Sequence, residues 1–189
     1  MKNLLAYIHS LTTFSEQHWE HLQPALTVEY YGKGDYLLKA GQICDALFFI
    51  SRGYCRAYYD KDGVDINTDF FFEDEIATNI NSYGRREPSA FAIQACEDTE
   101  VVRFDREQLL AAAARDSQIE TLGRLCLQRI AAKQEKHAAL FKLMSAQERY
   151  AYLEEHYPEM LQRVSLSQLS SFLGIARETL SRIRARRSS

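Results

Sequence analysis

The sequence lacks the features that mark membrane and exported proteins. None of its apolar runs is long enough to span a bilayer, and its first ten residues lack the basic flank and long apolar stretch of a signal peptide. The composition, with 46% hydrophobic and 26% charged residues, is ordinary for a globular chain. We therefore expect a cytoplasmic protein that makes no membrane contact.

Groups for metal and redox chemistry are also scarce. The four cysteines form no CxxC pair, which leaves zinc and iron–sulfur sites with little support. We expect reduced, mostly buried cysteines, with a redox-sensing thiol as the lesser alternative. Residues 26–104 contain no histidine, which argues against a cupin-type catalytic metal, and the five histidines elsewhere are expected on the surface. The sequence therefore predicts no cofactor, no metal site and no enzymatic activity.

Negative charge is in small excess and is unevenly distributed. The net charge is −3, but residues 163–189 carry six arginines and one glutamate, so this tail holds +5 and the remainder holds −8. A basic end on an acidic body is typical of an anchored nucleic-acid-binding module. A solubilising helical tail would carry the same charge, so the charge alone does not decide between the two.

Short runs rich in aromatic and β-branched residues fill the first half of the chain. They predict strands at residues 26–31, 46–51, 54–60, 64–72, 89–95 and 99–104. Strands of this length and spacing predict a sandwich or a closed barrel. The longest interruption, residues 73–88, is polar and is expected to carry one short helix.

Helical patterns flank these strands. Capping signals mark four predicted helix starts: Thr13 with Glu16, Asp105 with Gln108, Ser145 with Glu148, and Ser165 with Gln168. A longer helix is expected after Asp116. Its apolar residues form a seam with spacings of 3, 4 and 4: Ile119, Leu122, Cys126 and Ile130. The seam fits either the chain's own core or a dimer contact, and its place between two modules favours the dimer.

The C-terminal segment contains two short helical patterns around one glycine. Residues 164–187 read VSLSQLSSFLGIARETLSRIRARR. A helix over residues 167–173 is expected to end at Gly174, where a tight turn needs left-handed backbone, and a second helix is expected to begin near Ala176. The apolar residues that would fill the wedge between them are Leu166, Leu169, Leu173, Ile175, Leu180 and Ile183. These features together favour a DNA-binding helix-turn-helix over a helical hairpin with a solvated basic face.

Several segments resemble the Crp/Fnr family of regulators. Arg177-Glu178-Thr179-Leu180-Ser181-Arg182, preceded by Leu173-Gly174-Ile175, resembles the helix-turn-helix of that family. Residues 34–41 and 47–53 resemble the opening strands and turns of its cyclic-nucleotide-binding jelly roll. The order of the parts along the chain agrees as well.

The resemblance implies an α+β fold in three parts. These are a jelly-roll sensor domain at residues 1–115, a dimerisation helix at 116–141 and an all-α helix-turn-helix domain at 142–189. The implied function is sequence-specific transcription regulation by a homodimer on pseudo-palindromic double-stranded DNA, with RNA polymerase as a candidate further partner. The alternative is a regulatory module that acts on a protein partner without binding DNA.

The second helix of the motif carries the residues expected to contact DNA. The resemblance assigns base reading to Arg177, Glu178 and Arg182, whose side chains can pair with guanine or accept from cytosine. Phosphate contacts are expected from Thr179, Ser181, Arg184, Arg186 and Arg187. Two departures weaken the match. Ala176 stands where a capping serine or threonine is usual, and the chain ends at Ser189, before the family's β-hairpin wing, so we expect some phosphate contacts to be lost.

The sensor pocket departs further from the family's cyclic-nucleotide binders, in which a glutamate holds the ribose and an arginine pairs with the phosphate. Glu75 best matches that glutamate, but Pro88, directly before Ser89, occupies the arginine position. Proline has neither a charge nor an N–H donor, and burying a phosphate without a cation is costly. Arg85 and Arg86 could supply the cation, although arginine pairs in surface loops are often solvated. The predicted effector pocket, formed by Glu75, Arg85, Arg86 and Ser89, is therefore expected to take an unidentified effector other than cyclic AMP. The alternatives are that the domain responds to a protein or has kept only the scaffold.

Overall fold

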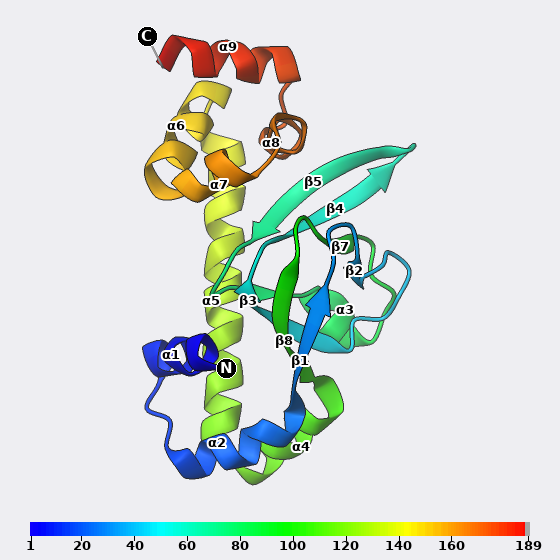
Figure 1. Ribbon diagram of the computed structural model, residues 1–189, viewed down its shortest axis with the longest axis vertical. Helices are drawn as coiled ribbons and strands as arrows, with labels where there is room; N and C mark the ends of the chain where they lie inside the picture. The colour runs from blue at the N-terminus through cyan, green and yellow to red at the C-terminus, as the bar shows by residue number, and fades with distance from the viewer. Residues whose placement is uncertain (188–189) are drawn as a thin grey trace. The chain divides into compact units, whose positions relative to one another are not determined.

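Two compact units make up the chain, of which the computed structural model describes residues 1–187 and every side chain except that of Arg187. The first unit consists of residues 1–59 and 69–130. The second consists of residues 60–68 together with the chain from residue 131 onward. Figure 1 labels most of the helices and strands of both. The tip of one strand pair thus belongs to the same unit as the C-terminal helices.

The strands form two four-stranded sheets, with the orders β1-β8-β3-β6 and β2-β7-β4-β5. Their bounds are β1 Leu26–Tyr31, β2 Tyr36–Leu38, β3 Ala46–Arg52, β4 Cys55–Lys61, β5 Val64–Phe71, β6 Ile76–Ala77, β7 Ala92–Ala95 and β8 Thr99–Asp105. In the first sheet, β1 and β3 both pair antiparallel with β8. Buried side chains of both sheets, among them Leu38, Ile50, Ile93 and Val101, pack into one cluster, which is the interior of a β-sandwich.

The strand predictions are confirmed for the longer strands. β1 begins and ends at the predicted residues, β3, β5 and β8 each differ from the prediction by one residue at one end, and β4 is shifted by one residue at both ends. β7 is shorter than predicted and begins only at Ala92. The two strands that the residue pattern did not predict, β2 and β6, are three and two residues long. Runs this short carry too few residues to display a two-residue alternation.

Helices flank the sandwich in the sequence. In the first unit they are α1 Lys2–Leu11, α2 Glu16–Leu22, the 3-10 turn η1 Gln23–Ala25, α3 Ile80–Arg85, α4 Arg106–Arg115 and the first half of α5 Ser117–Leu143. The predicted short helix in the polar interruption is therefore confirmed as α3. No helix within residues 1–187 combines the length and the apolar character needed to cross a membrane.

Two capping predictions in this unit have different outcomes. Asp105 caps α4 as predicted, since its carboxylate accepts from the Gln108 N–H at 3.1 Å. The predicted box of Thr13 with Glu16 is wrong, because α2 is capped by the Ser15 side chain. Ser15 lies directly before the helix, where a side-chain oxygen can reach the free N–H groups of the first turn.

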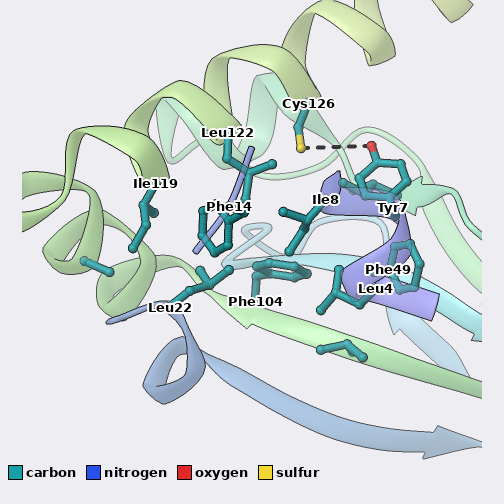
Figure 2. Packing of buried hydrophobic residues seen from close by; sticks show 13 residues of the cluster. Leu4, Tyr7, Ile8, Phe14, Leu22, Phe49, Phe104, Ile119, Leu122 and Cys126 are labelled. Atoms are coloured by element: carbon teal, nitrogen blue, oxygen red, sulfur yellow. Dashed lines mark hydrogen bonds between the residues drawn. The ribbon is translucent and has the colours of Figure 1, made fainter. Parts of the chain in front are cut away.

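Helices α1 and α5 and strands β3 and β8 enclose a second apolar core (Figure 2). It buries Leu4, Tyr7, Ile8, Phe49, Phe104, Ile119, Leu122 and Cys126. Three residues of the apolar seam thus lie inside the chain's own core, and the fourth, Ile130, packs against it. The dimer interpretation of this seam is wrong. Its apolar face is already covered, largely by α1, so it is not available to a second subunit.

A small cavity of about 30 Å³ lies in this core, between α1 and α5. Gly123 of α5 lines it, and a Cβ at this position would meet no atom within 4 Å. Glycine inside a helix lowers stability by roughly 1 kcal/mol relative to alanine. No close packing requires glycine here, so the core tolerates a larger side chain at position 123.

Gly123→Ala is therefore expected to raise the free energy of unfolding by about 1 kcal/mol, because alanine has a higher helix propensity than glycine. Urea denaturation followed by the fluorescence of the single tryptophan would measure the change. Gly84→Ala in α3 is the control, since a Cβ there also meets no neighbour and no core cavity is filled. A loss of stability in Gly123→Ala alone would contradict the prediction.

Asp116 connects α2 to the start of α5. Its Oδ2 accepts from Nδ1 of His18 at 2.7 Å and from Nδ1 of His21 at 2.8 Å, while its Oδ1 accepts from the Gln118 N–H at 2.9 Å. Burial alone would raise the pKa of Asp116, but the bonds from His21 and His18 and from the backbone lower it to about 2. The two histidines, expected as ordinary surface residues, therefore hold two helices together.

The cysteines are free thiols, and Cys44, Cys55 and Cys126 are buried. Burial raises the pKa of Cys96 and of Cys126 to about 11, and it also raises the pKa of Cys55 above its ordinary value. Those three thiols are protonated at neutral pH. Because the thiolate is the reactive form, they lack the character of redox sensors.

The second unit consists mainly of helices. They are the remainder of α5, α6 Ala146–His156, α7 Pro158–Arg163, α8 Leu166–Leu173 and α9 Arg177–Arg187. The predicted capping box of Ser145 with Glu148 is confirmed in both directions. Ser165 caps α8 by accepting from the Gln168 N–H at 3.2 Å, also as predicted. These caps satisfy N–H groups that a helix start leaves unpaired.

Candidate nucleic-acid interface

A tight turn at Gly174 joins α8 to α9. Gly174 has φ of +65° and ψ of 36°, in the left-handed region that glycine adopts without strain. Its N–H donates to the Ser171 carbonyl at 3.1 Å, and the Ile175 N–H donates to the Ser170 carbonyl at 3.1 Å. This pair of bonds is a Schellman motif, which ends a helix and reverses the chain. The left-handed glycine predicted from the sequence is confirmed.

Gly174→Ala is expected to lower the free energy of unfolding by about 1–2 kcal/mol, because a Cβ is unfavourable in left-handed backbone. A Cβ here would meet no atom within 4 Å, so the cost comes from the backbone conformation alone. Thermal denaturation followed by circular dichroism would measure it. Gly174→Asn should cost less, since asparagine tolerates this conformation better. Equal stability of the alanine variant and the parent chain would show the expectation to be wrong.

Buried leucines fix α9 against α8. Leu180 of α9 is fully buried, as is Leu169 of α8, and Leu173 and Ile183 are nearly so. These side chains fill the wedge between the two helices, as the sequence predicted. Because one side of α9 is anchored in this way, the opposite side must face outward.

The outward face of α9 is polar. Glu178, Ser181 and Arg182 are all exposed, and Ser181 and Arg182 follow Glu178 by three and four positions, so both lie on the same side of the helix as Glu178. Arg177 is exposed at the first helical position. The predicted base readers are thus free of the core, and Ser181 lies beside them on the same face.

A groove of about 340 Å³ lies beside this face, between the start of α6 and α9. It is lined by Ser145, Ala146, Gln147, Thr179, Arg182, Ile183 and Arg186. Two arginines and the first residues of a helix thus line one hollow, and arginine side chains and helix starts both favour anions. The predicted phosphate residues Thr179 and Arg186 lie here. The residues of α6 were not predicted, although the capping signal at Ser145 marks a helix start.

Two arginines of α9, Arg182 and Arg184, differ in their contacts. The Arg184 guanidinium donates to the Leu161 carbonyl at 3.0 Å, which ties α9 to α7. The Arg182 guanidinium donates to the Thr179 hydroxyl at 3.3 Å, within its own helix. The side chain of Arg187 lies outside the described part of the chain. Phosphate contacts by Arg184 and Arg187 stay predictions.

The predicted effector residues lie along the segment between β6 and β7, apart from Glu75 just before β6. Ser89 is buried, and its hydroxyl donates to the Phe91 carbonyl at 2.6 Å and accepts from the Asn79 side-chain amide at 2.8 Å. Arg85 and Arg86 are exposed at the end of α3. The serine hydroxyl is thus engaged inside the protein, while the two arginines face solvent.

Glu75 is likewise engaged with its own turn. Its carboxylate accepts from the Phe72 N–H at 3.0 Å, and its carbonyl accepts from the Ile50 N–H at 2.9 Å. The neighbouring Glu73 accepts from the Gly53 N–H at 2.7 Å. The Glu75 carboxylate thus stabilises the turn between β5 and β6, and the Glu73 carboxylate joins this turn to the one between β3 and β4. Within residues 1–187, no cluster of three histidine, cysteine or acidic residues is arranged to hold a metal ion.

Comparisons with known proteins identify the fold. Residues 28–116 match the family model of the cyclic nucleotide-binding domain. A comparison with curated proteins finds no match. The match to the family model spans most of the sandwich described above.

Solved structures extend the similarity over most of the chain. FixK2 from Bradyrhizobium japonicum is 22% identical with a TM-score of 0.69, covering 85% of this chain and 83% of that one. The catabolite activator protein of Thermus thermophilus is 20% identical with a TM-score of 0.57, covering 95% and 85%. A protein of the Crp/Fnr family from Eubacterium rectale is 14% identical with a TM-score of 0.67, covering 90% and 82%. The predicted α+β fold, with its jelly roll, long helix and C-terminal helices, is confirmed, as is the resemblance to Crp/Fnr regulators at the level of the fold.

Proposed function

We propose that this chain, which has the cyclic-nucleotide-binding-type fold of the Crp/Fnr regulators, is a homodimeric, sequence-specific DNA-binding transcription regulator. We propose regulation, not catalysis, as its activity. The observation that carries the proposal is the two-sided α9, which is anchored by Leu180 and Ile183 and turns Glu178 and Arg182 outward. A rigidly held helix with a polar outer face is what major-groove recognition requires.

The outer face of α9 has the chemistry to read base edges. The major groove is about 12 Å wide and admits one helix. Arg177 and Arg182 can each pair bidentately with guanine, and Glu178 can accept from a cytosine amino group. Each such contact contributes roughly 1–3 kcal/mol of discrimination. We assign base reading to these three residues. Ser181 lies on the same face and keeps its predicted role as a phosphate contact.

The groove beside α9 suits the DNA backbone. A phosphate placed there would lie beside the start of α6, at Ala146 and Gln147, and beside Thr179 and Arg186 of α9. Such contacts fix the protein on the duplex without selecting a sequence. We assign phosphate binding to this groove, together with the positive charge of the C-terminal arginines.

We propose that the β-sandwich responds to an effector other than cyclic AMP. Pro88 offers neither a charge nor an N–H donor where the family's nucleotide binders have an arginine. The Ser89 hydroxyl already has a donor and an acceptor within the protein. Calorimetric titration with cyclic AMP should detect no binding at micromolar concentrations, and micromolar binding would refute this part of the proposal.

The dimer contact is assigned to the exposed side of α5, since its seam is buried. Leu127 is 50% exposed, and Ala131 and Ala138 follow on the same side at spacings of four and seven residues. Apolar residues at such spacings are typical of paired helices. Pairing through α5 would set two recognition helices about 34 Å apart, one turn of DNA.

Leu127→Glu is expected to weaken dimerisation by roughly two orders of magnitude, because it would place an unpaired carboxylate at the centre of the helix pair. Sedimentation velocity across a concentration series would measure the shift from dimer to monomer. The neighbouring exposed Gln128→Glu adds the same charge beside the proposed contact and should leave the dimer intact. A dimer that tolerates glutamate at position 127 would assign the contact to another surface.

Selection from a random duplex library by the purified chain tests the function directly. We expect a pseudo-palindromic motif, bound at least a hundred-fold more tightly than an unrelated duplex of equal length at physiological salt. Absence of any duplex binding would favour the alternative of a module that acts on a protein partner.

A further inference from the structure

The tip of the β4–β5 hairpin is preformed. Asp62 and Gly63 connect the strands with φ of 55° and 79°, the pair of positive values that a two-residue type I′ turn requires. The Gly63 N–H donates to the Asp60 carboxylate at 2.8 Å. Residues 60–68 therefore form a locally stiff element, and they belong to the same compact unit as the helix-turn-helix.

Ser171 of α8 binds the backbone of this hairpin. Its hydroxyl donates to the Asp65 carbonyl at 2.9 Å and accepts from the Asn67 N–H at 3.0 Å. Residues 65 and 67 lie two apart on β5, which is the last strand of its sheet, so both backbone groups point from the same edge. One serine thus occupies the place that a neighbouring strand would take, and it uses both its donor and its acceptor.

The position of Ser171 links this contact to the recognition helix. Ser171 lies in the last turn of α8, and its own carbonyl accepts from the Gly174 N–H, which fixes the turn into α9. While the serine is engaged, Arg177 and Arg182 remain exposed. The contact therefore holds the helix-turn-helix without covering the face assigned to DNA.

We infer that Ser171 is a positioning residue, through which the β4–β5 hairpin holds the helix-turn-helix ready for DNA. This inference rests on the proposed function. The hairpin leaves the first unit after Tyr59 and re-enters it at Asp69, so its tip is a covalent extension of the sandwich. A change in the sandwich can then reach the recognition helix through two hydrogen bonds. The contact restricts the motion of α8 before DNA binds. It therefore reduces the conformational entropy that the helix-turn-helix loses on binding.

Ser171→Ala removes both hydrogen bonds and little else. We expect operator affinity, measured by fluorescence anisotropy on the motif selected by the parent chain, to fall about five- to ten-fold, the size expected when modest hydrogen bonds are lost. Hydrogen exchange of the Asn67 amide, followed by NMR, should become at least several-fold faster. Ser171→Thr keeps the hydroxyl and should restore both measurements. Ser167→Ala, an exposed serine of the same helix, is the matched control and should change neither.

The outcomes separate the inference from the function beneath it. Faster exchange at Asn67 with unchanged operator affinity in Ser171→Ala would overturn the positioning role, and so would unchanged exchange. Failure of threonine to restore affinity would also overturn it, since the hydroxyl would not be the active group. If the parent chain bound no duplex, the proposed function would fall and the positioning role with it, whatever the exchange of Asn67 reported about the contact.

Discussion

Asp116→Ala is expected to lower the free energy of unfolding by about 3 kcal/mol. The carboxylate accepts from His18, from His21 and from the Gln118 N–H, so its removal leaves three donors without their acceptor. Hydrogen bonds to a charged group contribute about 1.5–3 kcal/mol each, and loss of a helix cap costs about 1 kcal/mol. The histidines are partly exposed, so water recovers part of this loss. Trp19 lies on α2 beside both histidines in sequence, so its fluorescence reports the local unfolding.

The pH dependence gives a second measure of the same contact. The pKa of Asp116 is about 2 in the folded chain, against about 3.9 in an unfolded one. A lowered pKa means that the stabilisation is complete above pH 4 and is lost as the pH falls toward 2. The parent chain should therefore lose stability between pH 4 and pH 2 more steeply than Asp116→Ala.

Two variants control for charge and shape at this position. Glu120→Ala removes an exposed acid from the same first turn of α5 and should cost less than about 0.5 kcal/mol. Asp116→Asn keeps one carbonyl oxygen and should fall between the parent and the alanine variant. If Asp116→Ala unfolded at the same urea concentration as Glu120→Ala, the hydrogen bonds of Asp116 with His18 and His21 would contribute nothing to stability. The conclusion that they hold α2 to α5 would then be wrong.

Arg177→Ala and Arg186→Ala are expected to damage DNA binding in different ways. Arg177 is assigned to a base, so its loss should reduce discrimination at one operator position by about ten- to a hundred-fold, equivalent to 1–3 kcal/mol. Arg186 lines the groove assigned to phosphate, so its loss should weaken binding to every sequence. It should also lower the slope of log affinity against log salt by about 1. Anisotropy titrations on the selected operator, on single-base variants and at several salt concentrations would measure all three quantities.

Lysine at position 177 separates charge from geometry. Arg177→Lys keeps the positive charge but loses the planar pair of donors that matches guanine. It should therefore retain the salt dependence of the parent chain while losing discrimination. If Arg177→Ala and Arg186→Ala changed specificity and salt slope alike, the division of α9 into base-reading and phosphate-binding residues would be wrong.

Signals that act over three or four residues were readable in the sequence. Asp105 and Ser145 cap helices where their spacing predicted, because a cap bonds N–H groups within the same turn. Gly174 adopts left-handed backbone because the chain must reverse there without a Cβ. The amphipathic pattern of α9 likewise separated the buried Leu180 from the exposed Arg182. The site on α9 could be assembled from such local patterns.

Contacts between distant segments were not readable. The spacing of the apolar seam on α5 fits a dimer contact and an internal core equally well. Only the packing of α1 against the seam shows that it belongs to the chain's own core. His18 and Asp116 are 98 positions apart, and Ser171 and Asp65 are 106 apart. Neither pair has a periodic signal, because each contact depends on how whole elements are placed.

The amino-acid order by itself therefore determined the elements of this protein, their caps and turns, and the chemistry carried on the outer face of α9. Those properties follow from backbone geometry and from neighbours within one or two turns. The tertiary structure alone decided which apolar face of α5 is covered, which side chains donate hydrogen bonds to Asp116 and which backbone groups Ser171 binds. Each of those depends on long-range packing, in which many weak contacts are optimised together and no short pattern records the result.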